Sequence, residues 1–330
     1  MQNELNIAVI GMGNIGTAIA NMMAESGVKV KGWDFLKEVV DEINAQQSNS
    51  RYLPDMELSE KLEATSNLEE AFDNKDIVFI TIPSSHIPRV LNPCRHRLKD
   101  NCLLVSLVKG VDAETGMTAS EMIQDIYPRN EVLVLSGPTI ATEFVKDLPC
   151  GVVIAGKNQK SLYKVASAIE TQAFRARFSS DAIGVEWAGI LKNLYVIGIG
   201  IIDGMEMDSI NFKSAFLTKA LEEMVALVTA LGGKSESVYY LAGLGDLLAT
   251  TLSPHSYNKR LGQLLAEGYS LDRAQEEMGT LPEGMNALRN AVYLSEKLHV
   301  PMPVAHGILS VTEGDIEPMY LIKNFMKIAI

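Results

Sequence analysis

The fold is decided near the amino terminus by the sequence LNIAVIGMGNIG, residues 5–16. Residues 5–10 form a short, β-branched apolar run, which is typical of a buried parallel strand. A glycine-rich turn follows at residues 11–16, and residues 17–26 then have helical spacing and stop at Gly27, a residue type that favours helix ends. A strand, a tight turn and a helix in this order predict the start of a βαβ unit.

The same alternation continues along the chain, where further apolar runs close at turn residues. The next predicted strands are residues 28–33, 77–82, 103–108, 132–135 and 151–155. Strands that alternate with helical stretches predict a parallel, doubly wound sheet with right-handed crossovers.

The pattern changes near residue 180, after which periodic helical segments dominate. The predicted helices are residues 182–202, 211–231, 236–249, 256–267, 271–278, 284–298 and 303–313. The sequence therefore predicts an α/β Rossmann-like, doubly wound domain at residues 1–180 and an all-helical domain at residues 181–330.

Composition narrows the class of protein. A net charge of -12 argues against general binding to nucleic acid or to an anionic membrane, because such surfaces need a basic excess. The three cysteines have no metal-ligand spacing and cannot all pair, which indicates reduced thiols in a cytoplasmic protein without a metal site. Residues 1–5 have no features of a secretory signal. The apolar run at residues 197–202 is expected to be too short and too interrupted to span a membrane.

The glycine-rich turn is predicted to bind a dinucleotide, because it follows a strand and opens a helix. Gly11 permits the tight turn, Gly13 lets the backbone approach a pyrophosphate, and Gly16 allows the helix to pack closely on the strand. The amino terminus of the helix adds N–H donors and the positive end of a dipole. The alternative is a Rossmann-like fold that binds no nucleotide.

Asp34 ends the second predicted strand, where a carboxylate can accept the two ribose hydroxyls of NAD. A 2′-phosphate there would meet like charge, and no arginine occupies the adjacent position, so NAD is favoured. Lys31 and Lys37 lie close by and keep NADP as the alternative cofactor.

Lys192 is the single charged side chain between Trp187 and Ile202, in an apolar helical run. Burying an ammonium without a partner is costly. One interpretation is a lysine whose stem packs while its head reaches solvent. The other is a lysine in a cleft, with a lowered pKa, that moves a proton.

A partner for Lys192 is predicted at Asp246, which lies one helical turn from Thr250 on the same face. Pairing would relieve the burial of both charges and set the proton affinity of the lysine. The alternative is that Asp246 only caps a helix after Gly245. Lys109 ends a predicted strand and is expected to point toward cofactor and substrate.

From the glycine turn to about residue 313, the chain resembles the NAD(P)-dependent glycerol-3-phosphate dehydrogenases. The resemblance is carried by GMGNIG at 11–16, VSLVKG at 105–110, SGPTIATE at 136–143, AGILKN at 188–193, LAGLGDL at 241–247 and PEG at 282–284. It implies a helical domain like that of 6-phosphogluconate dehydrogenase. It also implies the reversible, NAD-dependent reduction of dihydroxyacetone phosphate to sn-glycerol 3-phosphate, in glycerophospholipid metabolism, by an enzyme that is often a dimer.

The resemblance further implies roles for single residues. Lys192 matches the general acid that protonates the ketone oxygen, Lys109 matches a lysine that polarises substrate oxygens, and Asp246 matches a polar group beside the catalytic ammonium. Substrate contacts are implied at Lys109, Gly137, Thr139, Asn193, Thr250, Ser256, Tyr257 and Asn258. Cofactor contacts are implied at Gly11, Gly13, Asn14, Ile15, Gly16, Asp34, Pro83, Ala141 and Glu283.

The chain departs from the family pattern at Tyr257, where the family usually has an arginine that helps to hold substrate phosphate. A tyrosine hydroxyl offers one neutral hydrogen bond in place of a charged, bidentate fork. Lys259 or Arg260 is expected to compensate if the helix start shifts; otherwise the chain is a paralogue acting on a different small oxo-substrate. The pair Asn14-Ile15 also replaces the serine-aromatic pair that is common in the family's glycine turn.

A third hypothesis, from another functional class, is a protein that senses or presents NAD without chemistry. Lys109, Lys192 and Asp246 together argue against it, because a sensor does not need a proton donor.

Overall fold

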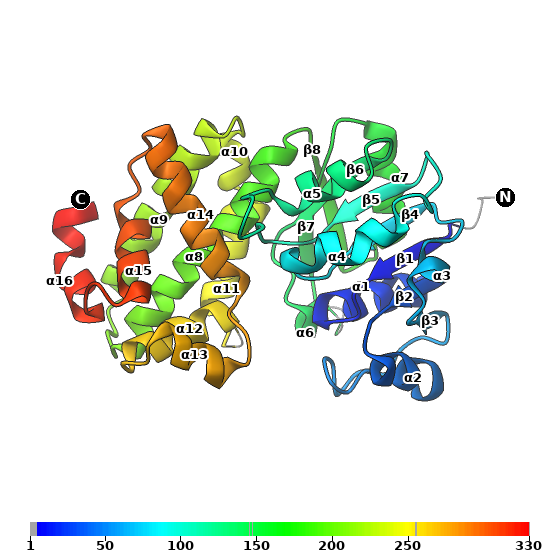
Figure 1. Cartoon of the computed structure of the whole chain (residues 1–330), viewed down its shortest axis with the longest axis horizontal. Coiled ribbons are helices and arrows are strands. Elements are labelled where there is room, and N and C mark those ends of the chain that lie inside the picture. Colours follow the sequence, from blue (N-terminus) through cyan, green and yellow to red (C-terminus); the bar gives the residue numbers. More distant parts are fainter. Residues whose placement is uncertain (1–4, 145, 147, 255, 330) are drawn as a thin grey trace. The chain divides into compact units, whose positions relative to one another are not determined.

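The computed structural model describes residues 5–144, 146, 148–254 and 256–329, and Figure 1 shows the chain coloured along its length. The chain forms two compact units. Unit 1 consists of Met1–Val108 and Met117–Ala182, and unit 2 consists of Lys109–Gly116 and Ile183–Ile330.

Unit 1 is built on one sheet with the strand order β3-β2-β1-β4-β5-β6-β7-β8. The strands are β1 (Ile7–Ile10), β2 (Val30–Trp33), β3 (Leu62–Thr65), β4 (Ile77–Ile80), β5 (Leu103–Ser106), β6 (Glu131–Ser136), β7 (Cys150–Ala155) and β8 (Phe174–Ser179). Neighbouring strands are parallel except β6 and β7, which pair antiparallel. The predicted Rossmann-like α/β class is confirmed, but the prediction of an entirely parallel sheet is wrong at this one pair.

Two strands were not predicted, and both lie at an edge of the sheet. β3 has the sequence LEAT and β8 has the sequence FRARFS, so neither contains a continuous apolar run. An edge strand has one neighbour and carries charged side chains readily, which removes the pattern by which the inner strands were recognised.

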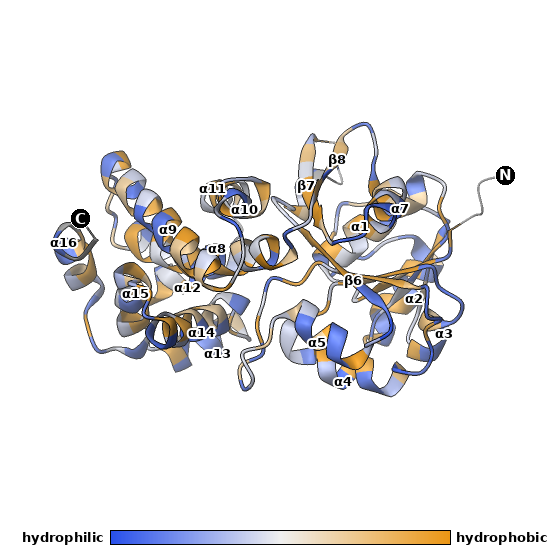
Figure 2. Ribbon diagram, turned by 90° about the horizontal axis from the view of Figure 1, so that it is seen from above, coloured by the Kyte–Doolittle hydropathy of each residue, from blue (hydrophilic) through white to orange (hydrophobic). Residues whose placement is uncertain are grey.

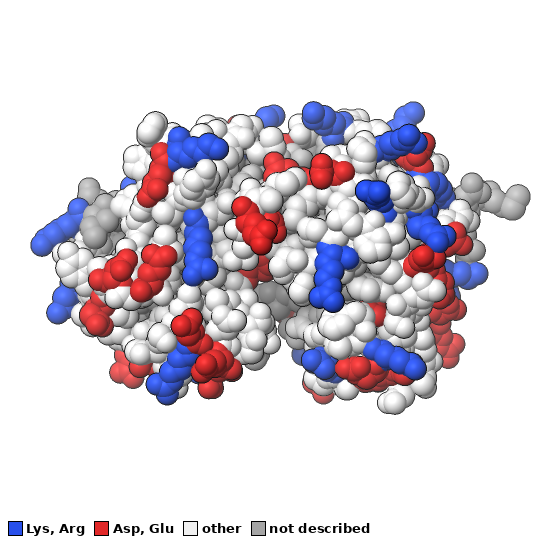
Figure 3. Space-filling model, viewed as in Figure 1, with Lys and Arg blue, Asp and Glu red and all other residues white. Residues whose placement is uncertain are grey.

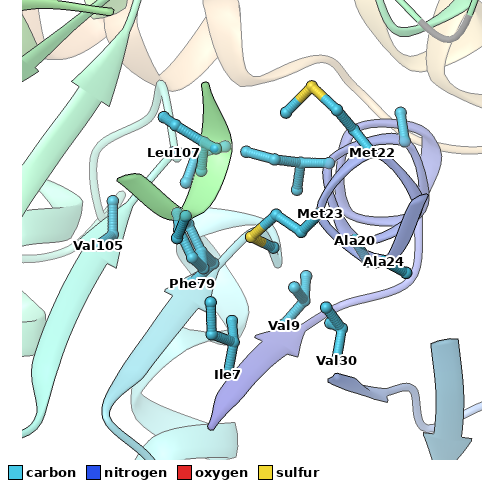
Figure 4. Close-up of a cluster of buried hydrophobic side chains, with 14 of the residues drawn as sticks. Ile7, Val9, Ala20, Met22, Met23, Ala24, Val30, Phe79, Val105 and Leu107 are labelled. Carbon is cyan, nitrogen blue, oxygen red and sulfur yellow. The ribbon is translucent and has the colours of Figure 1, made fainter. Parts of the chain in front are cut away.

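Helices cover both faces of the sheet, because alternate residues of a strand point to opposite sides. Ile7 and Val9 of β1 join one buried cluster, whereas Ala8 and Ile10 join another. Figure 4 shows the first cluster, in which Met23 lies near Val9 and Phe79. In Figure 2, α1 and α7 lie on one face of the sheet and α4 and α5 on the other. The helices of unit 1 are α1 (Asn14–Glu25), α2 (Lys37–Gln46), α3 (Leu68–Phe72), α4 (Ile87–Leu91), α5 (Ala119–Ile126), α6 (Ala141–Phe144) and α7 (Gln159–Ile169), with short 3₁₀ turns η1 (Ser84–His86) and η2 (Asn92–Cys94).

The described residues of 183–329 in unit 2 form helices joined by turns, as predicted, whereas the segment Lys109–Gly116 of the same unit contains no helix. The elements of unit 2 are α8 (Ala182–Gly204), α9 (Ile210–Ala230), α10 (Ser235–Val238), the π-helical turn η3 (Leu241–Gly245), α11 (Asp246–Leu252), α12 (Tyr257–Ala266), α13 (Leu271–Met278), α14 (Glu283–Leu298), α15 (Pro303–Glu313) and α16 (Pro318–Ala329). The single helix predicted at residues 236–249 is wrong, because the π turn separates α10 from α11. Helix α16 was not predicted, although Leu321, Ile322 and Phe325 bury one face of it.

Helix α8, predicted at residues 182–202, is by length and composition alone long and apolar enough to cross a membrane. It has 23 residues, and the apolar window within it is 100% buried inside the structure. Packing within the protein therefore accounts for its apolar character.

Two glycines bring α8 and α12 into backbone contact. A Cβ atom added at Gly200 of α8 would lie 2.1 Å from the carbonyl oxygen of Lys259, and one added at Gly262 of α12 would lie 2.1 Å from that of Ile197. No side chain fits at either position without separating the two helices.

Candidate active site and dinucleotide loop

The glycine loop, residues 11–16, has a different steric requirement at each glycine. Gly11 has a φ of +106°, which is the left-handed region that glycine tolerates. A Cβ atom at Gly16 would lie 1.8 Å from the Gly11 carbonyl oxygen, so only glycine lets α1 start this close to the loop. A Cβ atom at Gly13 would meet nothing within 4 Å. The backbone at Gly13 therefore borders open space, into which a ligand can approach.

The start of α1 offers hydrogen-bond donors beside that space. Gly13 is the N-cap of α1, Asn14 is its exposed first residue, and Ile15 is half-buried. The first N–H groups of a helix have no partner within the helix, and the helix dipole places partial positive charge there. The loop thus fits the pyrophosphate of a dinucleotide.

Asp34 lies directly after β2 and is 5% exposed. Its Oδ2 accepts a hydrogen bond of 2.9 Å from the Met12 N–H, and its Oδ1 accepts one of 3.0 Å from the Leu36 N–H. Lys31, one of the two lysines that kept NADP as an alternative, pairs with Glu63 and Glu70. Lys37 is exposed at the start of α2.

The remaining residues predicted in unit 1 follow the carboxyl ends of β4 and β6. Pro83 precedes η1 and is exposed, and Ala141 begins α6. Gly137 has a φ of +138°, and its carbonyl oxygen accepts a hydrogen bond of 3.3 Å from the Thr139 hydroxyl. Ligands bind at this edge of open α/β sheets.

In unit 2, the structure brings Lys109, Lys192, Asp246 and Thr250 together. Asp246 Oδ2 lies 2.7 Å from Lys109 Nζ, and Asp246 Oδ1 lies 3.4 Å from Lys192 Nζ. Lys192 Nζ donates a hydrogen bond of 2.6 Å to the Thr250 hydroxyl oxygen, and that hydroxyl donates one of 2.7 Å to the Asp246 carbonyl. We call these four residues the lysine cluster.

Two alternatives raised from the sequence, a Lys192 head that reaches solvent and an Asp246 that only caps a helix, are wrong. The Lys192 side chain is 7% exposed, so its head does not reach solvent. The N-cap of α11 is Gly245, and Asp246 is the first residue of the helix, with its carboxylate turned to the two lysines.

Burial lowers the pKa of Lys192 from 10.5 to about 8; the Asp246 carboxylate opposes this change and the Lys109 ammonium adds to it. An ammonium with a pKa near 8 gives up its proton more readily at neutral pH than an ordinary lysine does. The cluster carries two ammonium groups against one carboxylate, so it suits an anionic ligand.

Three helices meet next to the cluster through two asparagines. Asn193 Nδ2 donates a hydrogen bond of 3.2 Å to the Lys109 carbonyl, and Asn258 Nδ2 donates one of 3.1 Å to Asn193 Oδ1. The N–H of Gly284 in α14 donates one of 3.2 Å to Asn258 Oδ1. Glu283, the residue before it, is the first residue of α14.

Tyr257 is the first residue of α12 and is 64% exposed. Ser256 caps the helix, because its Oγ accepts the Lys259 N–H. The two cations that follow Tyr257 in the sequence are both paired with acidic side chains. Lys259 Nζ lies 2.7 Å from Asp203 Oδ2, and Arg260 Nη1 lies 3.3 Å from Glu267 Oε1.

Two buried polar residues that hold distant segments of the chain were not predicted. Asn49 contacts the glycine loop. Glu223 of α9 accepts hydrogen bonds from the Tyr195 hydroxyl and from the N–H groups of Val304 and Ala305, and burial raises its pKa to about 7. Their partners are distant in sequence, so local spacing gave no indication of them.

Comparison with known proteins assigns both parts of the chain to one family. Residues 6–162 match the model for the amino-terminal part of NAD-dependent glycerol-3-phosphate dehydrogenase, and residues 181–323 match the model for its carboxyl-terminal part. The chain belongs to this family.

Relatives with known names agree with the assignment. The chain is 33% identical over 320 residues to glycerol-3-phosphate dehydrogenase [NAD(P)+] of Clostridium tetani, with 97% of this chain and 91% of the relative covered. It is 36% identical over 308 residues to the enzyme of the same name from Pseudomonas paraeruginosa, with 93% and 90% covered.

Solved structures agree as well. A crystal structure of glycerol-3-phosphate dehydrogenase from Coxiella burnetii has a TM-score of 0.92 and 30% identity, with 98% of this chain and 99% of that chain covered. A ketopantoate reductase from Ralstonia eutropha, with a TM-score of 0.63 and 15% identity, shares the fold. As a member of the glycerol-3-phosphate dehydrogenase family, the chain is an oxidoreductase of CH–OH groups that uses NAD(P).

Proposed function

We propose that the protein catalyses the reversible, NAD-dependent reduction of dihydroxyacetone phosphate to sn-glycerol 3-phosphate, with Lys192 as general acid and base. The observation that carries this proposal is the buried Lys192 ammonium, held by Thr250 and Asp246, with a pKa lowered to about 8. The family supplies the class of substrate, and the cluster supplies a proton donor at neutral pH.

When bound, NADH supplies hydride to the carbonyl carbon of the ketone. Lys192 donates its proton to the ketone oxygen, and in the reverse direction it removes the proton of the hydroxyl. Thr250 orients the ammonium, because its own hydroxyl hydrogen is committed to the Asp246 carbonyl and its oxygen is left to accept from Lys192. Lys109, paired with Asp246, places a second positive charge beside the oxygen atoms of the substrate.

We assign the remaining predicted residues by unit. Residues 1–180 are proposed as the NAD-binding domain and residues 181–330 as the substrate domain, to which Lys109–Gly116 adds Lys109. NAD is preferred over NADP, because Asp34 carries negative charge at the end of β2 and Lys31 is paired with two glutamates. A kcat/KM for NADPH equal to or above that for NADH would contradict this preference.

The test of function is the oxidation of NADH by the purified protein with dihydroxyacetone phosphate, followed at the nicotinamide absorbance band. Turnover supports the proposal. Binding of NADH without turnover of any oxo-substrate would instead favour a protein that senses the nucleotide.

A second candidate function is the reduction of a different small oxo-substrate, and Tyr257 favours it. The two cations that were expected to replace the family's arginine, Lys259 and Arg260, are each paired with an acidic side chain. Losing a charge-assisted contact to phosphate costs about 1.5–3 kcal/mol. A panel of phosphorylated and unphosphorylated ketones separates the two candidates, since preference for an unphosphorylated ketone would favour the second.

We further infer a cytoplasmic homodimer that serves glycerophospholipid metabolism. In the described part of the chain Cys94, Cys102 and Cys150 form no disulfide, which suits a reducing compartment. Figure 3 shows acidic and basic side chains interspersed over the visible face, which suits a small-molecule substrate better than nucleic acid. Light scattering of the purified protein tests the dimer.

A further inference from the structure

The backbone of the glycine loop is held by side chains from four separate segments of unit 1. The Met12 N–H donates to Asp34, and the Met12 carbonyl accepts 2.8 Å from the Thr17 hydroxyl and 2.9 Å from Asn49 Nδ2. One residue earlier, the Gly11 carbonyl accepts a hydrogen bond of 2.7 Å from the Thr81 hydroxyl. The peptide groups on both sides of Met12 are therefore fixed, and the next residue is Gly13, which borders open space.

Of the three side chains that bind the Met12 backbone, Asn49 is the most distant in sequence, 37 residues away, and it is 0% exposed. It lies in a turn after α2, where its carbonyl accepts hydrogen bonds from the N–H groups of Tyr52 and Leu53. Glu42 of α2 holds the same turn, since its carboxylate accepts from the Ser48 hydroxyl and the Ser50 N–H. Asn49 is thus anchored independently of the loop that it contacts.

The amide of Asn49 is only half satisfied. Its nitrogen donates to the Met12 carbonyl and, at 2.8 Å, to the Thr17 hydroxyl, whereas its oxygen is buried with no hydrogen-bond partner in the described part of the chain. A buried acceptor without a donor lowers stability, so the oxygen of this amide has a cost that an apolar group would not have. The role of the amide here therefore lies in its donor group, which binds the Met12 carbonyl and the Thr17 hydroxyl.

We propose that Asn49 is a positioning residue for the cofactor: it fixes the Met12 carbonyl and thereby orients the N–H groups that follow it for the dinucleotide pyrophosphate. The geometry of a binding group depends on the side chains that hold it, and small displacements weaken binding strongly. Asn49 acts through the loop and is not itself a contact of the reacting atoms.

The test is the substitution Asn49→Leu in the full-length protein, with the Kd for NADH measured by fluorescence titration and the unfolding midpoint measured by thermal denaturation. Leucine has the branching of asparagine, and Thr17 still donates to the Met12 carbonyl, so the protein should fold. Its larger methyl groups replace contacts of 2.8 and 2.9 Å, so the midpoint should fall modestly. The Kd for NADH should rise about tenfold, the equivalent of one lost hydrogen bond. In steady state, KM for the cofactor should rise while KM for the substrate stays within twofold.

Asn44→Leu is the matched control. Asn44 also holds backbone through its amide, with hydrogen bonds to both the N–H and the carbonyl of Ala64 in β3, but it does not contact the glycine loop. Its substitution should lower the unfolding midpoint and leave the Kd for NADH within about twofold, so a loss of stability alone is separated from a loss of cofactor affinity.

Thr17→Val gives a second route to the same conclusion, because it removes the other donor to the Met12 carbonyl without changing the shape of the side chain. It should also raise the Kd for NADH, by about threefold, which corresponds to a hydrogen bond at the weak end of the usual range. An unchanged Kd in folded Asn49→Leu protein overturns the proposal, as does an equal rise in Asn44→Leu. If Asn49→Leu does not fold, an unchanged Kd in Thr17→Val overturns it. Failure of the unaltered protein to bind NADH would be a different result, directed at the cofactor itself.

Discussion

Replacing Lys192 with methionine should slow catalysis severely and yet stabilise the folded protein at neutral pH. Methionine fills a similar volume in α8 and brings no charge. Asp246 keeps an ion pair with Lys109, at 2.7 Å, so the substitution turns a cluster of two cations and one anion into a balanced pair. The proton donor is lost, and turnover should fall by about 10²–10⁴-fold.

The gain in stability follows from the pKa of Lys192. The fall in this pKa from 10.5 to about 8 reflects burial, which disfavours the charged form in the folded state. At about 1.36 kcal/mol per pKa unit, holding the lysine charged costs about 3 kcal/mol of folding free energy. This cost applies in full below pH 8, where both states are charged. It disappears as the pH rises toward 10.5, because the folded state loses its proton first.

Urea unfolding at pH 7 and at about pH 10 measures this directly. The methionine variant should exceed the unaltered protein by about 3 kcal/mol at pH 7, and the difference should shrink at the higher pH. Lys297→Met, at an exposed site on α14, is the control and should change stability by less than about 1 kcal/mol at both values. A Lys192→Met protein that is less stable at pH 7, or a difference that does not change with pH, would refute this account of the cluster.

Three further substitutions test the same unit. Asp246→Asn leaves two ammonium groups without their carboxylate, and urea unfolding should show a loss of about 3–5 kcal/mol. Burial raises the pKa of Glu223 from 4.5 to about 7, so the folded state holds this proton more tightly than the unfolded state does. The free energy of unfolding should therefore fall by up to about 3 kcal/mol as the pH rises from 4.5 through 7. Unfolding curves of Glu223→Gln should lack this dependence on pH. Gly200→Ala places a Cβ atom 2.1 Å from the Lys259 carbonyl oxygen, so calorimetry should show a loss of about 1–3 kcal/mol, whereas an unchanged melting temperature would contradict the close packing of α8 on α12.

Local patterns in the sequence were enough to predict the strand-turn-helix start of unit 1 and the pairing of Lys192 with Asp246. The first depends on residues within one short segment, and the second on the high cost of an unpaired charge in an apolar run. The pattern was also enough to place Thr250, because it lies one helical turn from Asp246.

The features that were missed depend on contacts between distant segments. Nothing local shows that β7 pairs antiparallel with β6 and parallel with β8, and the edge strand β8 lacks the apolar run of an inner strand. The spacing of apolar residues across the π turn at Leu241–Gly245 matches that of one continuous helix, so the break between α10 and α11 was not predicted. Asn49 and Glu223 become informative only when the backbone groups that they bind have been placed beside them.

The segment Lys109–Gly116 belongs to unit 2, although the chain on both sides of it belongs to unit 1. The gene for such a protein does not divide cleanly into a cofactor part and a substrate part. In a chimaera joined near residue 182, Lys109 would come from one parent and its partner Asp246 from the other. Exchange of substrate halves between relatives should therefore preserve the lysine cluster only when this eight-residue insert travels with the helices, which calls for three junctions in place of one.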